Sequence, residues 1–165
     1  RAGNVIGGGD WAEDRLIPDI LKSFEKNEPA VIRNPKAVRP WQHVLEPLSG
    51  YLLLAARLYE NPKNWSGSWN FGPSTKEACT VQKVTEVIIN HLGRGHIEIV
   101  KSPVQAHEAQ LLQLNCDKAH QLLDWYPRWN IDQTLHATAL WYKTVMRGGN
   151  AEQITKEQIH NFFKE

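Results

Sequence analysis

The residues best suited to chemistry stand near the start of the chain, where Asn4 lies in a short apolar run and glycines follow at positions 7–9. An Asn side chain offers both a hydrogen-bond donor and an acceptor, and glycines let backbone N–H groups approach phosphate oxygens closely. Arg15 stands at the start of a predicted helix, where its charge adds to the positive helix terminus. Together these residue types suit a diphosphate. A glycine loop with a purely structural Asn explains the same spacing equally well.

Two arginines, Arg33 and Arg39, form a second candidate group in a predicted strand–turn–strand unit. The guanidinium group pairs with phosphate through a planar fork of N–H donors. A single arginine is more often solvated or salt-bridged. If residues 38–44 form one strand, however, Arg39, Trp41 and His43 share one face because side chains alternate along a strand. This clustering favours Arg39 as a ligand-binding residue.

The remaining polar motif is His107–Glu108, which falls in a predicted loop. A His beside a Glu suits acid–base chemistry or a hydrogen bond to a sugar hydroxyl, although a surface pair is the more frequent outcome. The seven histidines show no H-x-x-x-H or H-E-x-x-H spacing, so no metal site is predicted. There is also no Ser-His-Asp order, G-x-S-x-G elbow, P-loop or glycine-rich dinucleotide fingerprint.

Length and composition indicate one globular domain over residues 1–165, with 41% hydrophobic residues and a net charge of +1. That charge is too small for a nucleic-acid surface, and no run of about 18 apolar residues predicts a membrane span. Cys79 and Cys116 have no ligand-like spacing, so we expect free thiols in a reducing compartment. The chain starts with Arg1 and its one methionine is Met146. We therefore expect it to derive from a longer protein.

Apolar periodicity predicts the elements that position these residues. Helices are expected at residues 13–26, 47–59, 80–91, 115–124 and 131–147, with a short last helix that begins at Thr155. The helix at 47–59 is predicted to bury a stripe formed by Leu48, Leu52, Ala55, Ala56 and Tyr59. Thr80 is predicted to cap one helix, and Asn130 with Gln133 to form a capping box.

Short strands are expected between these helices, at residues 1–6, 30–33, 38–44, 68–71, 97–100 and 111–114. Pro40 restricts one of them to an edge or a bend. Full-length strands do not alternate with helices, so a complete doubly wound sheet is not predicted. The seven tryptophans are expected to pack in the core more often than to stack on a ligand.

Four blocks in this order resemble the extended short-chain dehydrogenase/reductase family, and within it the branch of the CDP-glucose 4,6-dehydratases. They are residues 1–19 (RAGNVIGGGDWAEDRLIPD), 33–48 (RNPKAVRPWQHVLEPL), 69–73 (WNFGP) and 107–119 (HEAQLLQLNCDKA). The second block is the most particular to this branch. The resemblance implies an α/β fold, specifically the C-terminal part of a Rossmann-type fold with its substrate-binding lobe.

The resemblance also implies that CDP-glucose is the ligand and that several residues contact its phosphates. Asn4 would bond the pyrophosphate or the sugar, Arg15 and the backbone at Leu16 would contact the phosphates, and Arg39 would pair with the pyrophosphate.

The resemblance implies that four further residues lie beside the base and the sugar. Ile32 and Arg33 would lie beside the cytosine, and Asn70 and His107 would face the phosphate–sugar side of the cleft. Val104 stands where the dTDP-glucose branch has a phosphate-binding arginine, so one positive charge is expected to be absent or supplied elsewhere.

The family reaction implied is an internal redox dehydration with bound NAD, which gives a CDP-4-dehydro-6-deoxy sugar for bacterial surface polysaccharide. In the family, the dinucleotide loop and the catalytic groups precede the position of Arg1. We therefore expect no catalytic residue in this chain and no activity from the chain alone. Family members are cytoplasmic homodimers. A non-catalytic nucleotide-sugar-binding module and a related epimerase or dehydratase remain alternatives.

Overall fold

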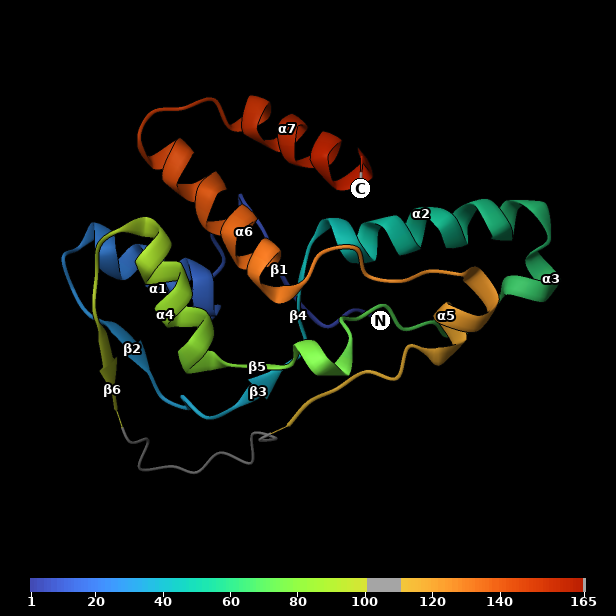
Figure 1. Cartoon of the computed structure of the whole chain (residues 1–165), viewed down its shortest axis with the longest axis horizontal. Coiled ribbons are helices and arrows are strands. Elements are labelled where there is room, and N and C mark those ends of the chain that lie inside the picture. Colours follow the sequence, from blue (N-terminus) through green and yellow to red (C-terminus); the bar gives the residue numbers. More distant parts are fainter. Residues whose placement is uncertain (101–110, 165) are drawn as a thin grey trace.

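The computed structural model describes residues 1–100 and 111–164 and shows a mixed α/β architecture (Figure 1). The helices are α1 (Leu16–Glu25), α2 (Leu45–Glu60), α3 (Pro62–Trp65), α4 (Val81–Leu92), α5 (Asp117–Leu123), α6 (Ile131–Met146) and α7 (Ala151–Lys164), with a 3₁₀ turn at Thr75–Glu77. The strands are β1 (Asn4–Ile6), β2 (Ala30–Ile32), β3 (Val38–Arg39), β4 (Trp41–His43), β5 (Cys79–Thr80) and β6 (Ile97–Ile99). None of these helices is long and apolar enough to cross a bilayer.

The strands pair two by two. β1 runs parallel to β4 with Asn4 opposite Trp41, and β2 runs parallel to β6. β3 pairs antiparallel with β5. A single bridge joins Ala2 to Phe71, beside the first residues of β1. Parallel pairs of this kind normally belong to larger sheets that are covered on both faces.

The first hydrophobic cluster lies where α1, α4 and α6 pack over the strands, on the left of Figure 1. Leu21, Val84 and Leu135 are among its most deeply buried side chains. The predicted periodicity explains why α1 and α4 pack in this cluster, because apolar residues recur every three or four positions along one face of each helix.

The second cluster joins α2, α5 and the segment that leads into Phe71. The Phe71 ring meets Tyr51 and Trp125 edge-on, with ring centroids 5.4 Å and 5.0 Å apart. Gly50 gives it room, because a Cβ there would lie 2.3 Å from the ring. Buried tryptophans at positions 41, 69, 125 and 141 confirm that these rings pack in the core.

The predicted helix termini are largely confirmed. The Thr80 hydroxyl accepts a hydrogen bond from the Lys83 N–H at 3.2 Å, and Asn130 and Gln133 form the complete capping box. Gly93 ends α4 in the left-handed conformation at φ 73°.

Several predicted boundaries were wrong. The last helix begins at Ala151, not Thr155, because the Asn150 side chain caps it by accepting from the Gln153 N–H. Pro40 divides the strand expected at 38–44 into β3 and β4, since proline lacks the N–H that a continuous ladder needs. The strands expected at 68–71 and 111–114 are each reduced to an isolated bridge, at Phe71 and at Leu111.

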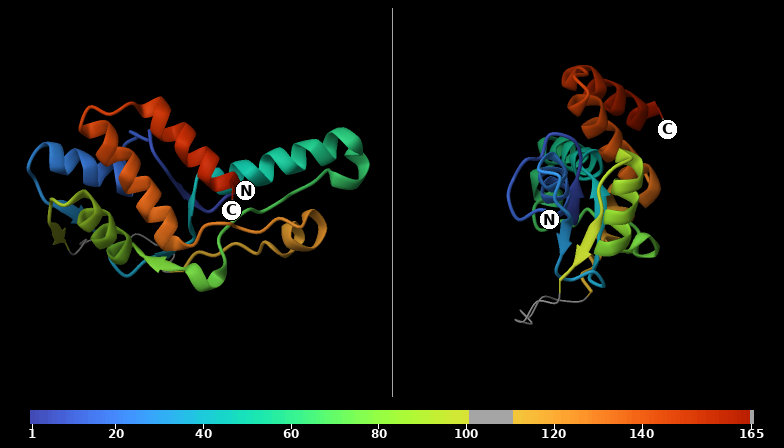
Figure 2. Two further views of the ribbon diagram at one scale, coloured as in Figure 1. Left: turned by 45° about the horizontal axis from the view of Figure 1, so that its top comes forward. Right: turned by 90° about the vertical axis from the view of Figure 1, so that its left-hand side faces the viewer.

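The burial predicted for α2 was also wrong. The helix forms, but the predicted stripe faces outward: Leu52 is 68% and Tyr59 93% exposed, and Ala55 and Ala56 are exposed as well. α2 is instead held by Glu46, Pro47 and Gly50 at its start and by Leu53 and Leu54 on its opposite side. Figures 1 and 2 show α2 projecting from the body of the molecule toward α3.

Candidate functional site

A cavity of about 510 Å³ lies between β1 and the start of α1, and its size is typical of small-molecule sites. Three of the predicted residues, Asn4, Arg15 and Leu16, line it together. Pro40 and Trp41 form another part of its wall. The parallel pairing of β1 with β4 brings these two segments together, because it sets Asn4 opposite Trp41.

A second cavity of about 450 Å³ adjoins the first, and the two share Asp14 and Leu16 in their walls. Ile32 and Arg33, the two residues predicted to lie beside the base, both line this second cavity. Ile32 is the last residue of β2, which pairs parallel with β6, and Arg33 directly follows it. Five of the eight predicted residues therefore surround two neighbouring hollows.

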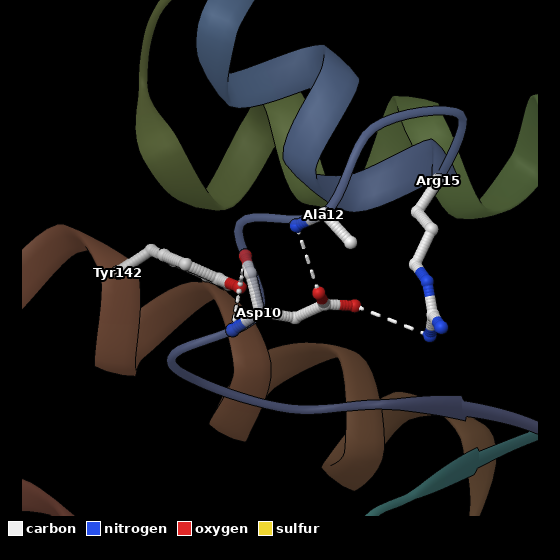
Figure 3. A network of polar contacts seen from close by, with 4 residues as sticks. All are labelled: Asp10, Ala12, Arg15 and Tyr142. Atoms are coloured by element: carbon white, nitrogen blue, oxygen red, sulfur yellow. Dashed lines mark hydrogen bonds and ion pairs between the residues drawn. The ribbon is translucent and has the colours of Figure 1, made fainter.

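The Arg15 guanidinium is held at the first cavity by Asp10 (Figure 3). Arg15 Nη1 lies 3.5 Å from Asp10 Oδ2, and Asp10 Oδ1 accepts from the Ala12 N–H at 3.1 Å. Both side chains are partly open to solvent, so the ion pair is weak and an incoming anion can compete for the arginine.

Tyr142 of α6 fixes the loop that carries Asp10 (Figure 3). Its hydroxyl donates to the Asp10 carbonyl oxygen at 2.7 Å and accepts from the Asp10 N–H at 3.0 Å. Burial raises the pKa of Tyr142 to about 12, so the phenol stays protonated and can keep both bonds. The loop is thus anchored at one residue by two hydrogen bonds from a distant helix.

The glycines at 7–9 have a structural reason that is independent of any ligand. A Cβ on Gly8 would lie 2.0 Å from the Trp141 indole ring, and a Cβ on Gly7 would lie 2.8 Å from Val44. Gly9 has a φ of 83°, which favours glycine. Close packing therefore accounts for Gly7 and Gly8, and the positive φ accounts for Gly9.

The other predicted residues lie elsewhere. Arg39 is buried, its Nη1 donates to the Val38 carbonyl oxygen at 3.0 Å, and it does not line either cavity. The Asn70 side chain donates to the Asn115 carbonyl oxygen at 2.9 Å and also lies outside both. His107 falls outside the described residues. Roles in ligand binding for all eight residues remain predictions.

Several residues that line the first cavity were not predicted from the sequence. Leu112 and Leu114 face the first cavity together, as alternation along the extended segment at 111–114 could have indicated. Asp10 forms a local turn by bonding to Ala12, a signal that Asp side chains often give. No sequence pattern links Asp10 to Tyr142, which lies 132 positions away.

Tyr59 and Lys63 have the Tyr-x-x-x-Lys spacing of the catalytic pair that the family resemblance places ahead of Arg1. The pair does not share a helix, because α2 ends at Glu60 and Asn61 leaves the helical conformation at φ −152°. In the described part of the chain, no group of three or more His, Cys, Asp or Glu residues forms a metal site.

The chain is similar in sequence and in structure to known proteins. A CDP-glucose 4,6-dehydratase of Salmonella typhimurium (strain LT2) is 47% identical over 162 residues, which make up 98% of this chain but 45% of that protein. No family model matches the chain.

Solved structures show the same fold. A dTDP-glucose 4,6-dehydratase from Bacillus anthracis in complex with NAD superposes with a TM-score of 0.72 at 24% identity, over 90% of this chain and 45% of that one. A UDP-glucuronic acid 4-epimerase from Bacillus cereus superposes with a TM-score of 0.70 at 18% identity, over 88% and 44% of the two chains. The likeness lies in the C-terminal portion of these Rossmann-type proteins.

Over nearly its whole length the chain is therefore similar to part of a CDP-glucose 4,6-dehydratase, and it spans less than half the length of that curated relative.

Proposed function

We propose that this chain is the substrate-binding part of a CDP-glucose 4,6-dehydratase and that it is inactive by itself. The enzyme would convert CDP-glucose to CDP-4-dehydro-6-deoxy-glucose, a precursor of surface polysaccharide. The identity of 47% with the Salmonella dehydratase supports this substrate above the alternatives.

The observation that carries the proposal is the pair of adjoining cavities. The first offers the Asn4 amide and the Arg15 guanidinium, which suit a diphosphate linker. The second offers Ile32 and Arg33, which suit a pyrimidine base and its ribose. The cavities share Asp14 and Leu16 in their walls, which supports one extended ligand that reaches from the first to the second.

The described residues of this chain would bind and orient the ligand rather than transform it. NAD, when bound, supplies the hydride transfer, and dehydratase structures of this fold contain it. Arg15 would exchange Asp10 for a phosphate oxygen, and the Tyr142 anchor would keep the loop in place during that exchange. The free thiols of Cys79 and Cys116 support a cytoplasmic location. A homodimer is proposed only for the longer protein.

Turnover tests the proposal. The chain alone, and the chain mixed with the portion of the Salmonella dehydratase that it does not match, are incubated with CDP-glucose and NAD. Mass spectrometry should show a product that has lost one water in the mixture, and none with the chain alone. Failure of the mixture, and of a single-chain hybrid of the two portions, to form that product would refute the proposed reaction.

Measuring the affinity for CDP-glucose gives a second test of the proposed function. Arg15→Ala should weaken CDP-glucose binding by about tenfold or more, since a hydrogen bond to a charged group contributes about 1.5–3 kcal/mol. Arg147→Ala is the matched control, because Arg147 is an exposed arginine at the end of α6, outside both cavities. Calorimetric competition with dTDP-, UDP- and GDP-glucose identifies the nucleotide. Tighter binding of any of these would replace CDP-glucose as the assigned substrate.

A further inference from the structure

The second cavity, which is the proposed site of the base, is lined by apolar side chains and by a small number of polar ones. Ile20, Ile32 and Ala37 are buried members of its apolar wall. Apolar walls of this kind suit the flat faces of a pyrimidine ring, and a few placed polar groups give such a site its specificity. The polar side chains of this cavity are therefore the candidates for reading the edge of the base.

Three of these polar side chains carry a full charge, namely Asp14, Asp19 and Arg33. Asp19 lies on the face of α1 that lines the cavity, three residues after Leu16 and four before Ser23. α1 packs against β2, and Arg33 directly follows β2. The two elements therefore present a carboxylate and a guanidinium group to the same cavity.

The Asp19 carboxylate is available as a hydrogen-bond acceptor. In the described part of the chain no hydrogen bond or salt bridge engages its oxygens, and the Ser23 hydroxyl donates at 2.9 Å to the Asp19 backbone carbonyl instead. Partial burial is the largest influence on the pKa of the Asp19 carboxyl and raises it, whereas the charge of Arg33 is among those that lower it. Asp19 and Arg33 are thus near enough to attract each other.

A carboxylate in this cavity can distinguish cytosine from the other pyrimidines. The exocyclic amine of cytosine is a hydrogen-bond donor, and Asp and Glu side chains are suited to accept from it. Uracil and thymine carry a carbonyl oxygen at the same ring position, which is an acceptor like the carboxylate itself. Asp19 would therefore stabilise cytosine and repel the other two bases.

Arg33 completes the same pattern of donors and acceptors. Beside its amine, cytosine carries a ring nitrogen and a carbonyl oxygen that both accept hydrogen bonds, and a guanidinium group only donates them. Uracil and thymine carry an N–H at that ring nitrogen, which leaves a guanidinium with one acceptor fewer. The two charged side chains therefore favour the same base.

We propose that Asp19 selects cytosine by accepting a hydrogen bond from the exocyclic amine of the base, while Arg33 donates to the neighbouring acceptors of the ring. This inference rests on the proposed function, because it requires the base to occupy the second cavity. Asp14 is the less suitable carboxylate, since it lines both cavities and so lies where the linker of an extended ligand would pass.

Competition calorimetry with CDP-glucose and UDP-glucose tests this selection at pH 8, where an Asp carboxyl is ionised. The wild-type chain should bind CDP-glucose at least about tenfold more tightly than UDP-glucose, which is the discrimination that a well-placed base contact gives. Asp19→Asn should reduce this ratio by about fivefold or more, because an amide can donate to a carbonyl oxygen as well as accept from an amine. Asp19 is exposed, so the variant should keep the fold.

Asp14→Asn is the matched control. It removes one carboxylate charge from the same pair of cavities, and asparagine tolerates the left-handed conformation that position 14 adopts at φ 58°. This substitution should change the affinities for CDP-glucose and UDP-glucose by the same factor and leave their ratio as in the wild type.

The outcomes separate the role of Asp19 from the proposed function. A ratio that is the same in the wild type and in Asp19→Asn, or that changes equally in the two variants, would overturn the role of Asp19 while CDP-glucose remains the ligand. Absence of CDP-glucose binding by both the chain and its single-chain hybrid with the Salmonella portion, or tighter binding of UDP-glucose, would overturn both proposals.

Discussion

The two hydrophobic clusters differ in how completely they are covered. The first is enclosed by α1, α4 and α6, and Leu21 and Val84 within it have no exposed surface. The second is enclosed on one side of α2, while the stripe of α2 that was predicted to be buried, which includes Leu52 and Tyr59, is exposed. Apolar periodicity therefore predicted burial for a face of α2 that is exposed in the described part of the chain.

A buried carboxylate joins the two clusters. Glu46, at the start of α2, accepts the backbone N–H groups of Arg128 at 3.0 Å and Trp129 at 2.7 Å. These residues lead into α6, which belongs to the first cluster. Burial raises the pKa of Glu46 in spite of these bonds. The junction is therefore a polar connection between two apolar regions.

Truncating the centre of the second cluster should have the largest effect and should show whether the clusters unfold separately. Phe71→Ala is expected to cost about 3–5 kcal/mol, because it leaves a cavity between Tyr51 and Trp125. Hydrogen exchange should accelerate in α2 and α5 more than in α4 and α6. Leu135→Ala in the first cluster is the control and should give the opposite pattern. Equal acceleration in all four helices would show one cooperative unit.

Low pH is expected to destabilise the fold through protonation of His43, which lies at the end of β4. Burial lowers the pKa of His43 from 6.5 to about 4, so the unfolded chain binds a proton that the folded chain does not between these values. The free energy of unfolding is therefore expected to fall by about 3 kcal/mol as the pH drops from 6.5 to 4. Urea unfolding at a series of pH values measures this loss.

His43→Gln should remove most of that pH dependence, whereas His160→Gln, at an exposed position on α7, should leave it in place. An unchanged slope in the His43 variant would assign the acid sensitivity to other groups.

Loss of the Glu46 carboxylate should have the smallest effect of the three. Glu46→Ala leaves the N–H groups of Arg128 and Trp129 without their acceptor, at a cost of about 1–3 kcal/mol. Glu46→Gln keeps one acceptor oxygen and should recover part of that loss in thermal unfolding. If the alanine variant is as stable as the wild type, the two clusters are held together by packing alone.

The sequence predicted local structure best where a signal lies within a few residues. The Thr80 cap and the capping box of Asn130 and Gln133 are such signals, and both are confirmed. The start of α7 was placed at Thr155 and not at Ala151, because Asn150, the residue whose side chain caps the helix, was not considered as a cap.

The candidate site was predictable only in part. The family pattern grouped Asn4, Arg15 and Leu16, which do share a cavity, but it also included Arg39, which lies outside it. The division of the expected strand by Pro40 places Arg39 in the ladder with Cys79, separate from Trp41. Long-range contacts such as that between Asp10 and Tyr142 depend on tertiary packing, which no local pattern encodes.

The contact between Gly8 and Trp141 ties distant parts of the chain to one another. The indole ring occupies the space where a side chain at position 8 would stand, and its Nε1–H donates to the Thr155 hydroxyl of α7 at 2.8 Å. Among related proteins, positions 8 and 141 are thus expected to vary as a pair. A larger residue in the loop should occur only where a smaller one replaces the tryptophan.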